Sequence, residues 1–269
     1  MNTSFISIIG CGNIGSAITK GFIKSNAFKL NNIILTKRKI DTLKDFKKNG
    51  LEITDNNIDA IKKSKIILIT VGPSQLIPIL ENIASHLNKN HIIISIVSGV
   101  AICEIQKIIG NKIPIVRAMP NTAADLCESM TCLATTTDFS KEIKIVNDLF
   151  DHIGKTLVIS EEKMASATAL GACGVAFFLR AIRAASQGGI EIGFHSDEAF
   201  TIAAQTARGA ATLLLHNNAH PESEIDRVTT PMGATIAGLN EMEHQGFSSA
   251  MIKGITTSTE KVSKLFDKT

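Results

Sequence analysis

The chain contains neither tryptophan nor tyrosine among its 269 residues. Without tyrosine no phenol can donate a proton, which excludes chemistry of the short-chain-dehydrogenase type. Cysteine is scarce as well, and no two cysteines form a CxxC pair. An odd number of scattered thiols is typical of reduced cysteines in a cytoplasm and argues against a disulfide framework or a zinc site. The thiols belong to Cys11, Cys103, Cys127, Cys132 and Cys173.

An excess of one charge and a long apolar run are also missing. The 28 basic and 25 acidic residues nearly cancel, so we expect no nucleic-acid partner. The nearest candidate for a membrane span, residues 165–179, is shorter than the ~20 residues that cross a bilayer. The start, Met1-Asn-Thr-Ser, lacks the basic region of a secretion signal. These absences predict a cytoplasmic protein without a membrane partner. No metal site is expected, because no suitable ligand spacing occurs among His195, His216, His220 and His244.

Short β-branched runs alternate with helical patterns over the first part of the chain. Continuous apolar strands between helices predict an α/β fold with a parallel sheet covered on both faces. The predicted strands are Phe5–Ile9, Ile33–Leu35, Ile66–Val71, Ile92–Ile96, Ile113–Arg117, Met130–Ala134 and Lys155–Ile159. The predicted helices between them include Ile40–Lys48, Gln75–Leu87 and Ile102–Ile109.

The composition changes near Ser160, where strand patterns stop and small residues dominate long helical stretches. We predict one long helix or a kinked pair over 161–192, and a second helix over 196–215. Segments this apolar need burial, and we infer burial against a second subunit as well as within their own domain. Burial within one subunit only is the alternative. The length also favours two domains. The expected limits are 1–159 for a cofactor-binding domain and 160–269 for an all-helical domain.

The segment Gly10-Cys-Gly12-Asn-Ile-Gly15 joins a predicted buried strand to a predicted helix. A GxGxxG pattern in this context is typical of a socket for a dinucleotide pyrophosphate. Gly10 permits the tight turn, Gly12 lets the backbone approach the phosphates, and Gly15 lets the helix press on the strand. The first N–H groups of the helix would face the anion. The alternative is a purely structural turn.

The next strand ends in Thr36-Lys37-Arg38-Lys39, where an NAD site usually places an acidic residue for the ribose 2′-hydroxyl. Three cations and a hydroxyl suit the 2′-phosphate of NADP, which a carboxylate would repel. The sequence therefore favours NADPH over NADH. A solvated basic turn is the alternative.

Further segments follow predicted strands, at the edge where the cofactor crevice of a parallel sheet lies. These are Val71-Gly72-Pro73, Ser98-Gly99 and Asn121-Thr122. The polar pair Asn121-Thr122, after Pro120, suits the nicotinamide carboxamide or its ribose. The predicted cofactor-binding residues are Gly10, Cys11, Gly12, Asn13, Ile14, Gly15, Thr36, Lys37, Arg38, Val71, Gly72, Pro73, Ser98, Gly99 and Asn121.

Three segments together resemble pyrroline-5-carboxylate reductase. The first is the glycine loop, the second is Arg117-Ala-Met-Pro-Asn-Thr122, and the third is Val228-Thr-Thr-Pro231-Met-Gly233-Ala-Thr235-Ile-Ala-Gly-Leu-Asn-Glu-Met, followed by Gly246-Phe247. They occur in the family's order and span nearly the whole chain. The third is similar to the family's C-terminal signature, a Pro-x-Gly-x-Thr turn that opens a helix.

The resemblance implies a Rossmann domain followed by a helical dimerisation domain, and a homodimer or higher homo-oligomer. It implies NADPH-dependent reduction of 1-pyrroline-5-carboxylate to L-proline. The substrate would lie between the nicotinamide and the Pro231–Thr235 turn, completed by the partner subunit. The implied substrate-binding residues are Thr230, Gly233, Ala234 and Thr235, with Thr235 as the catalytic one. A cyclic imine is partly protonated near neutrality, so alignment with the cofactor suffices and the Thr235 hydroxyl could bond the ring nitrogen.

The chain departs from the family pattern at three places. Gly72 stands where a lysine is common, Met232-Gly233 replaces Gly-Gly, and Ala172-Cys-Gly-Val175-Ala-Phe177 lacks the usual proline and phenol. These departures indicate a divergent branch. Two other functions stay open: a β-hydroxyacid dehydrogenase, for which Lys163 is the only candidate lysine, and a non-catalytic NADP(H)-binding regulator.

Overall fold

The computed structural model describes residues 5–266 of the chain. Packing divides it into two compact units, residues 1–172 together with 258–269, and residues 173–257. The predicted limits, 1–159 and 160–269, follow the end of the strand pattern and differ from this division, because Met164 and Thr168 are buried in the first unit. The segment Met1–Ser4, in which no secretion signal was found, lies outside the described residues.

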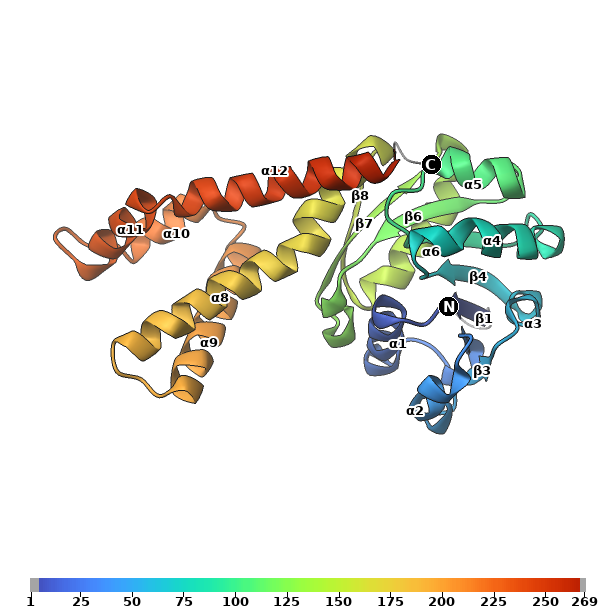
Figure 1. The fold of residues 1–269 in the computed structure, drawn as a ribbon, viewed down its shortest axis with the longest axis horizontal. Helices are drawn as coiled ribbons and strands as arrows, with labels where there is room; N and C mark the ends of the chain where they lie inside the picture. The colour runs from blue at the N-terminus through green and yellow to red at the C-terminus, as the bar shows by residue number, and fades with distance from the viewer. Residues whose placement is uncertain (1–4, 267–269) are drawn as a thin grey trace. The chain divides into compact units, whose positions relative to one another are not determined.

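The first unit is built on one eight-stranded sheet with the order β3-β2-β1-β4-β5-β6-β7-β8 (Figure 1). Every pair of neighbouring strands is parallel except β6 and β7, which are antiparallel. The strands are β1 (Phe5–Ile9), β2 (Ile33–Thr36), β3 (Glu52–Thr54), β4 (Ser64–Ile69), β5 (Ile92–Ser95), β6 (Ile115–Met119), β7 (Ser129–Thr135) and β8 (Gly154–Val158). The predicted fold class is confirmed.

Two features of the sheet differ from the prediction. Strand β3 was not predicted, because its three half-buried residues include Glu52 and form no apolar run. The antiparallel β6–β7 pair was not predicted either. Residues 120–128 connect these strands, and a parallel crossover needs a dozen or more residues.

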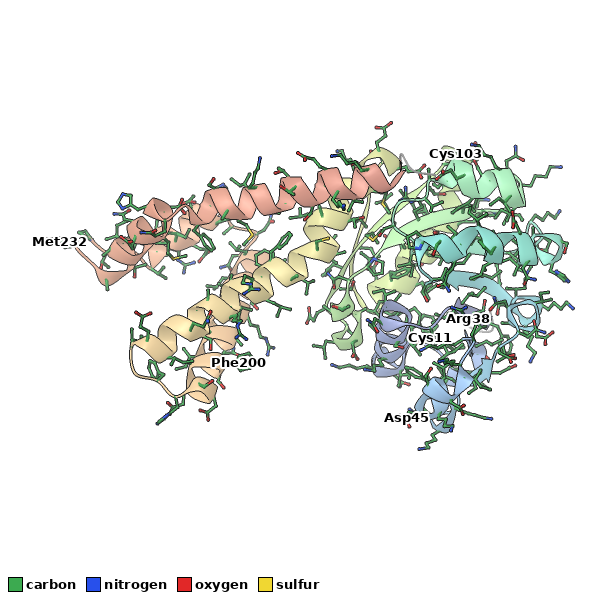
Figure 2. All side chains as sticks on the ribbon, viewed as in Figure 1. Cys11, Arg38, Asp45, Cys103, Phe200 and Met232 are labelled. Carbon is green, nitrogen blue, oxygen red and sulfur yellow. The ribbon has the colours of Figure 1, made fainter. Side chains whose placement is uncertain are left out.

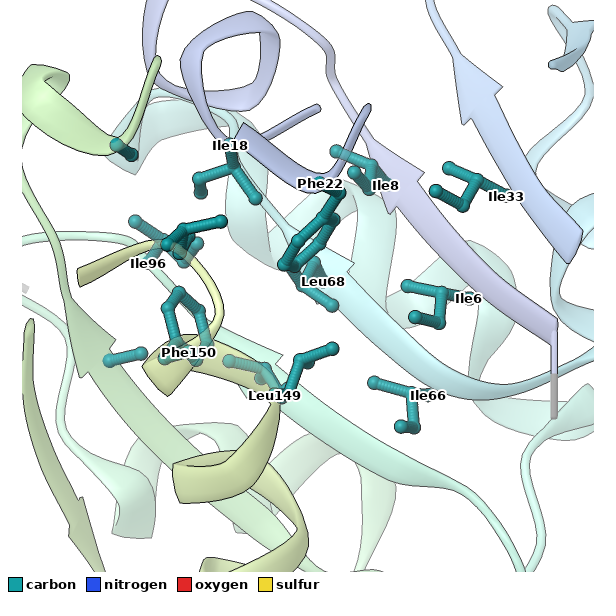
Figure 3. Close-up of a cluster of buried hydrophobic side chains, with 14 of the residues drawn as sticks. Ile6, Ile8, Ile18, Phe22, Ile33, Ile66, Leu68, Ile96, Leu149 and Phe150 are labelled. Atoms are coloured by element: carbon teal, nitrogen blue, oxygen red, sulfur yellow. The ribbon is translucent and has the colours of Figure 1, made fainter. Parts of the chain in front are cut away.

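Helices cover both faces of the sheet, as the apolar strands predict. Neighbouring residues of β1 show the two layers, since Ile8 and Ile9 belong to different buried clusters. On the Ile8 side, Phe22 and Phe150 pack on the sheet (Figure 3). The helices on that side are α1 (Asn13–Ser25) and α6 (Ser140–Asp151), and those on the other side are α3 (Asn57–Lys63), α4 (Pro73–Ile83) and α5 (Ile102–Ile109). The short helix α2 (Lys44–Lys48) follows β2.

One run of helical residues extends without a break from Glu161 to Glu191, within the predicted range 161–192. It begins with a 3₁₀ turn, Glu161–Lys163, and α7 (Met164–Ala167), continues as a π-helix (Thr168–Cys173), and ends with α8 (Gly174–Glu191). Its start is tied to the sheet, because Glu161 Oε1 accepts hydrogen bonds from the Ile102 N–H (2.7 Å) and from Arg117 Nη1 (3.1 Å).

This helical run is longer than the apolar stretch considered from sequence. By length and composition alone, Glu161–Glu191 could cross a membrane, and it is the one such helix found among residues 5–266. Its uninterrupted apolar part still spans only residues 164–179, between Lys163 and Arg180. A single helix of this kind is weak evidence for a membrane span, because the core helix of a soluble protein can have the same length and composition.

The second unit is all-helical over its described residues, as predicted. Its helices are α8, α9 (Ser196–Asn217), α10 (Pro221–Arg227), α11 (Ala234–His244) and most of α12 (Phe247–Phe266). At the start of α9, the Glu198 carboxylate accepts a hydrogen bond from the His195 N–H (2.9 Å). Large apolar side chains on α8 and α9 are about 60% exposed, at Phe178, Leu179 and Phe200.

Candidate functional site

The glycine loop lies between β1 and α1 and has the shape that the sequence predicts. Gly10 has φ +81°, and a Cβ there would collide with the Val71 side chain. A Cβ at Gly15 would lie 2.5 Å from Thr70 Oγ1, so only glycine lets α1 approach β4 this closely. A Cβ at Gly12 would meet only the Gly10 carbonyl oxygen, at an ordinary contact distance of 3.7 Å. The loop is therefore open toward solvent at Gly12 and tightly packed behind it.

The backbone of the loop presents the start of α1 as an anion site. The N–H groups of Gly10 and Cys11 both donate to the Thr36 carbonyl (3.1 Å), so they are not available for a ligand. Helix α1 begins at Asn13 with no acidic residue in its first turn. The first N–H groups of a helix lack intrahelical partners and carry its positive dipole end. A phosphate can bind there.

A cleft of about 1290 Å³ opens over this loop and the ends of the neighbouring strands. Its volume exceeds the range of ordinary small-molecule pockets and accommodates a dinucleotide. Of the predicted cofactor residues, the cleft brings together Gly10, Gly12, Asn13, Ile14, Thr36, Lys37, Arg38, Val71 and Gly72. The lining also includes Lys39 and Thr122, from segments to which the sequence pointed, and others that the sequence did not single out, among them Thr42, Asp55, Asn57 and Gln75.

The basic end of the cleft follows β2. Arg38, labelled in Figure 2, is exposed. Lys37 is half-buried, and both residues line the cleft. Thr36 differs from the expectation of a free hydroxyl, because it is buried and donates to Asn57 Oδ1 at 2.6 Å. Asn57 begins α3 after the unpredicted strand β3, so no recognised strand end drew attention to it.

Six predicted cofactor residues do not line the cleft: Cys11, Gly15, Pro73, Ser98, Gly99 and Asn121. The Cys11 thiol is buried beside Ser16 Oγ (3.5 Å), and burial raises its pKa. Pro73 is the first residue of α4. The hydroxyl of Ser98 faces Met119 Sδ at 3.9 Å, and Gly99 has φ +80°. These residues support the loops behind the cleft or lie at other strand ends.

The polar groups of Asn121 are engaged within the protein. Its Nδ2 donates to the Gly171 carbonyl (2.9 Å), and its Oδ1 accepts from the Ala123 N–H (3.0 Å). Only 8% of the residue is exposed. The carboxamide therefore caps the turn Thr122–Leu126 and contacts the helical run, whereas the sequence suggested a contact with nicotinamide.

In the second unit, the segment Thr230–Thr235 forms a turn that opens α11. The Gly233 N–H donates to the Thr230 carbonyl (2.9 Å), and Met232 between them has φ +59°. A Cβ at Gly233 would lie 2.5 Å from Thr230 Oγ1, so this position requires glycine. Thr230 and Thr235 are exposed, and Met232 projects fully from the turn (Figure 2). Ala234 is the first residue of α11.

Together, the sheet order, the glycine loop and the basic cleft define a dinucleotide-binding protein of the Rossmann class. Among residues 5–266, no group of three or more His, Cys, Asp or Glu side chains is placed to hold a metal ion. A family model described as NADP oxidoreductase coenzyme F420-dependent matches residues 5–99, and one described as pyrroline-5-carboxylate reductase dimerisation matches residues 161–265.

Two similar proteins from Dictyostelium discoideum carry the family name. Pyrroline-5-carboxylate reductase 1 is 52% identical over 97% of this chain, and the chain spans half of that longer relative. Pyrroline-5-carboxylate reductase 2 is 48% identical over 98% of this chain and 93% of its own length. The chain belongs to the pyrroline-5-carboxylate reductase family.

Solved structures agree in fold over the whole chain. A Plasmodium falciparum pyrroline carboxylate reductase with NADP bound has a TM-score of 0.89 and 25% identity, covering 99% of both chains. A pyrroline-5-carboxylate reductase from Coxiella burnetii has a TM-score of 0.90 and 27% identity, covering 98% of this chain and 99% of the other. The two-part architecture, a Rossmann-type sheet and a helical region, is therefore that of the family.

Proposed function

We propose that this protein uses NADPH to reduce the cyclic imine 1-pyrroline-5-carboxylate to L-proline, the last step of proline biosynthesis. The observation that carries the proposal is the cleft over the glycine loop with Lys37 and Arg38 at one end, in a chain of this family. A β-hydroxyacid dehydrogenase is less well supported. Its candidate lysine, Lys163, ends a 3₁₀ turn and does not line that cleft.

The cofactor part of the proposal rests on the fit of the cleft to a phosphorylated dinucleotide. The first N–H groups of α1, from Asn13 and Ile14 onward, would hold the pyrophosphate beside Gly12. Lys37 and Arg38 would hold the 2′-phosphate. Thr36 precedes them, and its side chain is fixed by the hydrogen bond to Asn57. Bound NADPH supplies the hydride, and the protein's own contribution is alignment and exclusion of water.

The substrate part of the proposal rests on the turn Thr230–Thr235. Backbone N–H groups at the start of α11, from Gly233 and Ala234 onward, would hold the carboxylate. The Thr235 hydroxyl would bond the ring nitrogen and stabilise it as it becomes an amine. A cyclic imine that arrives protonated needs no strong acid in the site, and no side chain of this turn has to ionise.

The assembly and location follow as further parts of the proposal. We attribute the exposed apolar side chains of α8 and α9, such as Phe178 and Phe200, to burial in a homodimer, which completes the substrate site. We assign residues 1–159 to cofactor binding and 160–269 to dimerisation and substrate binding. Free thiols throughout the described residues are typical of a cytoplasmic protein.

The direct test is oxidation of NADPH by the purified protein, with and without 1-pyrroline-5-carboxylate. Thr235→Val keeps the shape of the side chain and removes its hydroxyl. We expect this substitution to lower kcat more than it raises KM. The loss of transition-state stabilisation should be about 1–3 kcal/mol. Thr230→Val is the matched control and should have the smaller effect. If the wild-type protein binds NADPH but does not oxidise it when 1-pyrroline-5-carboxylate is added, the result would favour a non-catalytic regulator.

A further inference from the structure

Asn121 lies at a junction of three structural features in the first unit. It follows β6, it begins the turn that contains the cleft residue Thr122, and it contacts the helical run at Gly171. Its backbone N–H also donates to the buried Ser129 Oγ at 3.1 Å on β7. The Ser129 bond is made by the backbone, whereas the side chain of Asn121 bonds to Ala123 and Gly171.

The partner of Asn121 in the helical run belongs to its irregular part. Gly171 is in the π-helix Thr168–Cys173, a geometry that is rare and less favourable than the α-helix. This π-helix is also where the chain passes from the first unit to the second, which begins at residue 173. The first residues of the π-helix, Thr168 and Ala169, are buried, whereas a Cβ at Gly171 would meet nothing within 4 Å. At Gly171 the π-helix is held by the hydrogen bond from Asn121 Nδ2, at 2.9 Å.

We propose that Asn121 is a positioning residue for hydride transfer. Its bond to the Gly171 carbonyl holds the π-helix against the turn of Thr122, and so sets where the chain leaves the cofactor-binding unit. This inference rests on the proposed function, in which substrate contacts come from residues beyond that point. Small displacements of reacting groups lower rates steeply, by as much as a hundredfold for about 1 Å.

The decisive variant is Asn121→Asp, which keeps the Oδ1 acceptor for the Ala123 N–H and replaces the Nδ2 donor with an oxygen that faces the Gly171 carbonyl. In the full-length protein we expect amides of 168–173 to exchange at least about tenfold faster. We expect kcat to fall about tenfold or more, with the Kd for NADPH unchanged within about twofold. Ser129→Ala is the control, because it removes a different hydrogen bond to Asn121 and should leave kcat and exchange of 168–173 near wild type.

Two results would overturn the inference. One is unchanged exchange of residues 168–173 in Asn121→Asp. The other is a loss confined to NADPH affinity with kcat retained, which would make Asn121 a cofactor ligand. If Asn121→Asp does not fold, Asn121→Ser replaces it, because serine also caps helices but is too short to reach Gly171. If the wild type does not reduce the imine, the proposed function fails, and the exchange comparison still decides whether Asn121 holds the π-helix.

Discussion

The contact between Gly15 and Thr70 allows a sharp test of why the glycine loop needs its third glycine. An alanine at position 15 would place its Cβ 2.5 Å from Thr70 Oγ1 and 3.4 Å from Thr70 Cβ. Thr70 cannot easily turn away, because Oγ1 donates to the carbonyls of Ile9 (3.1 Å) and Gly10 (3.0 Å). We therefore expect Gly15→Ala to force α1 away from β4 and to distort the loop.

The size of the effect follows from two opposing terms. Overpacking of a buried contact costs about 1–3 kcal/mol, and alanine is about 1 kcal/mol better than glycine inside a helix. Gly15→Ala should then lower the free energy of unfolding by up to about 2 kcal/mol. In a Thr70→Ala background the collision is gone, so the same substitution should stabilise the protein by up to about 1 kcal/mol. The two sites should thus couple by about 1–3 kcal/mol.

Urea unfolding of the four proteins at one fixed concentration measures this coupling, since the stability of an oligomer depends on concentration. Titration with NADPH on the same samples should show weaker binding for Gly15→Ala alone and recovery in the double variant. The reasoning would be refuted by an equal loss of stability from Gly15→Ala in both backgrounds, which would mean that α1 does not depend on close approach at Thr70.

Three further predictions concern separate parts of the chain. Arg38→Ala should raise the KM for NADPH and leave that for NADH nearly unchanged in steady-state assays, and equal losses would contradict the 2′-phosphate assignment. Met232→Gly should stabilise the protein to urea by up to about 1 kcal/mol, because Met232 has φ +59°, whereas Gly233→Ala should destabilise it by collision with Thr230. Burial lowers the pKa of His91. The unfolded chain therefore binds the proton first as the pH falls below about 6.5, so stability should fall there, and His91→Asn should reduce that slope in unfolding measurements.

The local signals in the sequence were sufficient for the architecture of the sheet unit. Unbroken apolar strands such as Phe5–Ile9 can only be satisfied by burial on both faces, and the structure places Ile8 and Ile9 in separate clusters. The glycine loop was recognisable because its backbone conformation depends on residues close together in the chain. Strand β3 lacked such a signal, since Glu52–Thr54 is three residues long and contains one apolar residue.

Side-chain partners at the candidate site were beyond the reach of the sequence. Thr36 and Asn57 are 21 residues apart, and Asn121 and Gly171 are 50 apart, so their hydrogen bonds exist only because the sheet and helices bring the segments together. A polar residue after a strand can face a ligand or another part of the protein, and the residue type is the same in both cases. The sequence by itself determined the Rossmann-type sheet, the basic end of the cleft and the helical second half. Tertiary packing decided which of the predicted residues line the cleft and which, like Asn121, hold the protein together behind it.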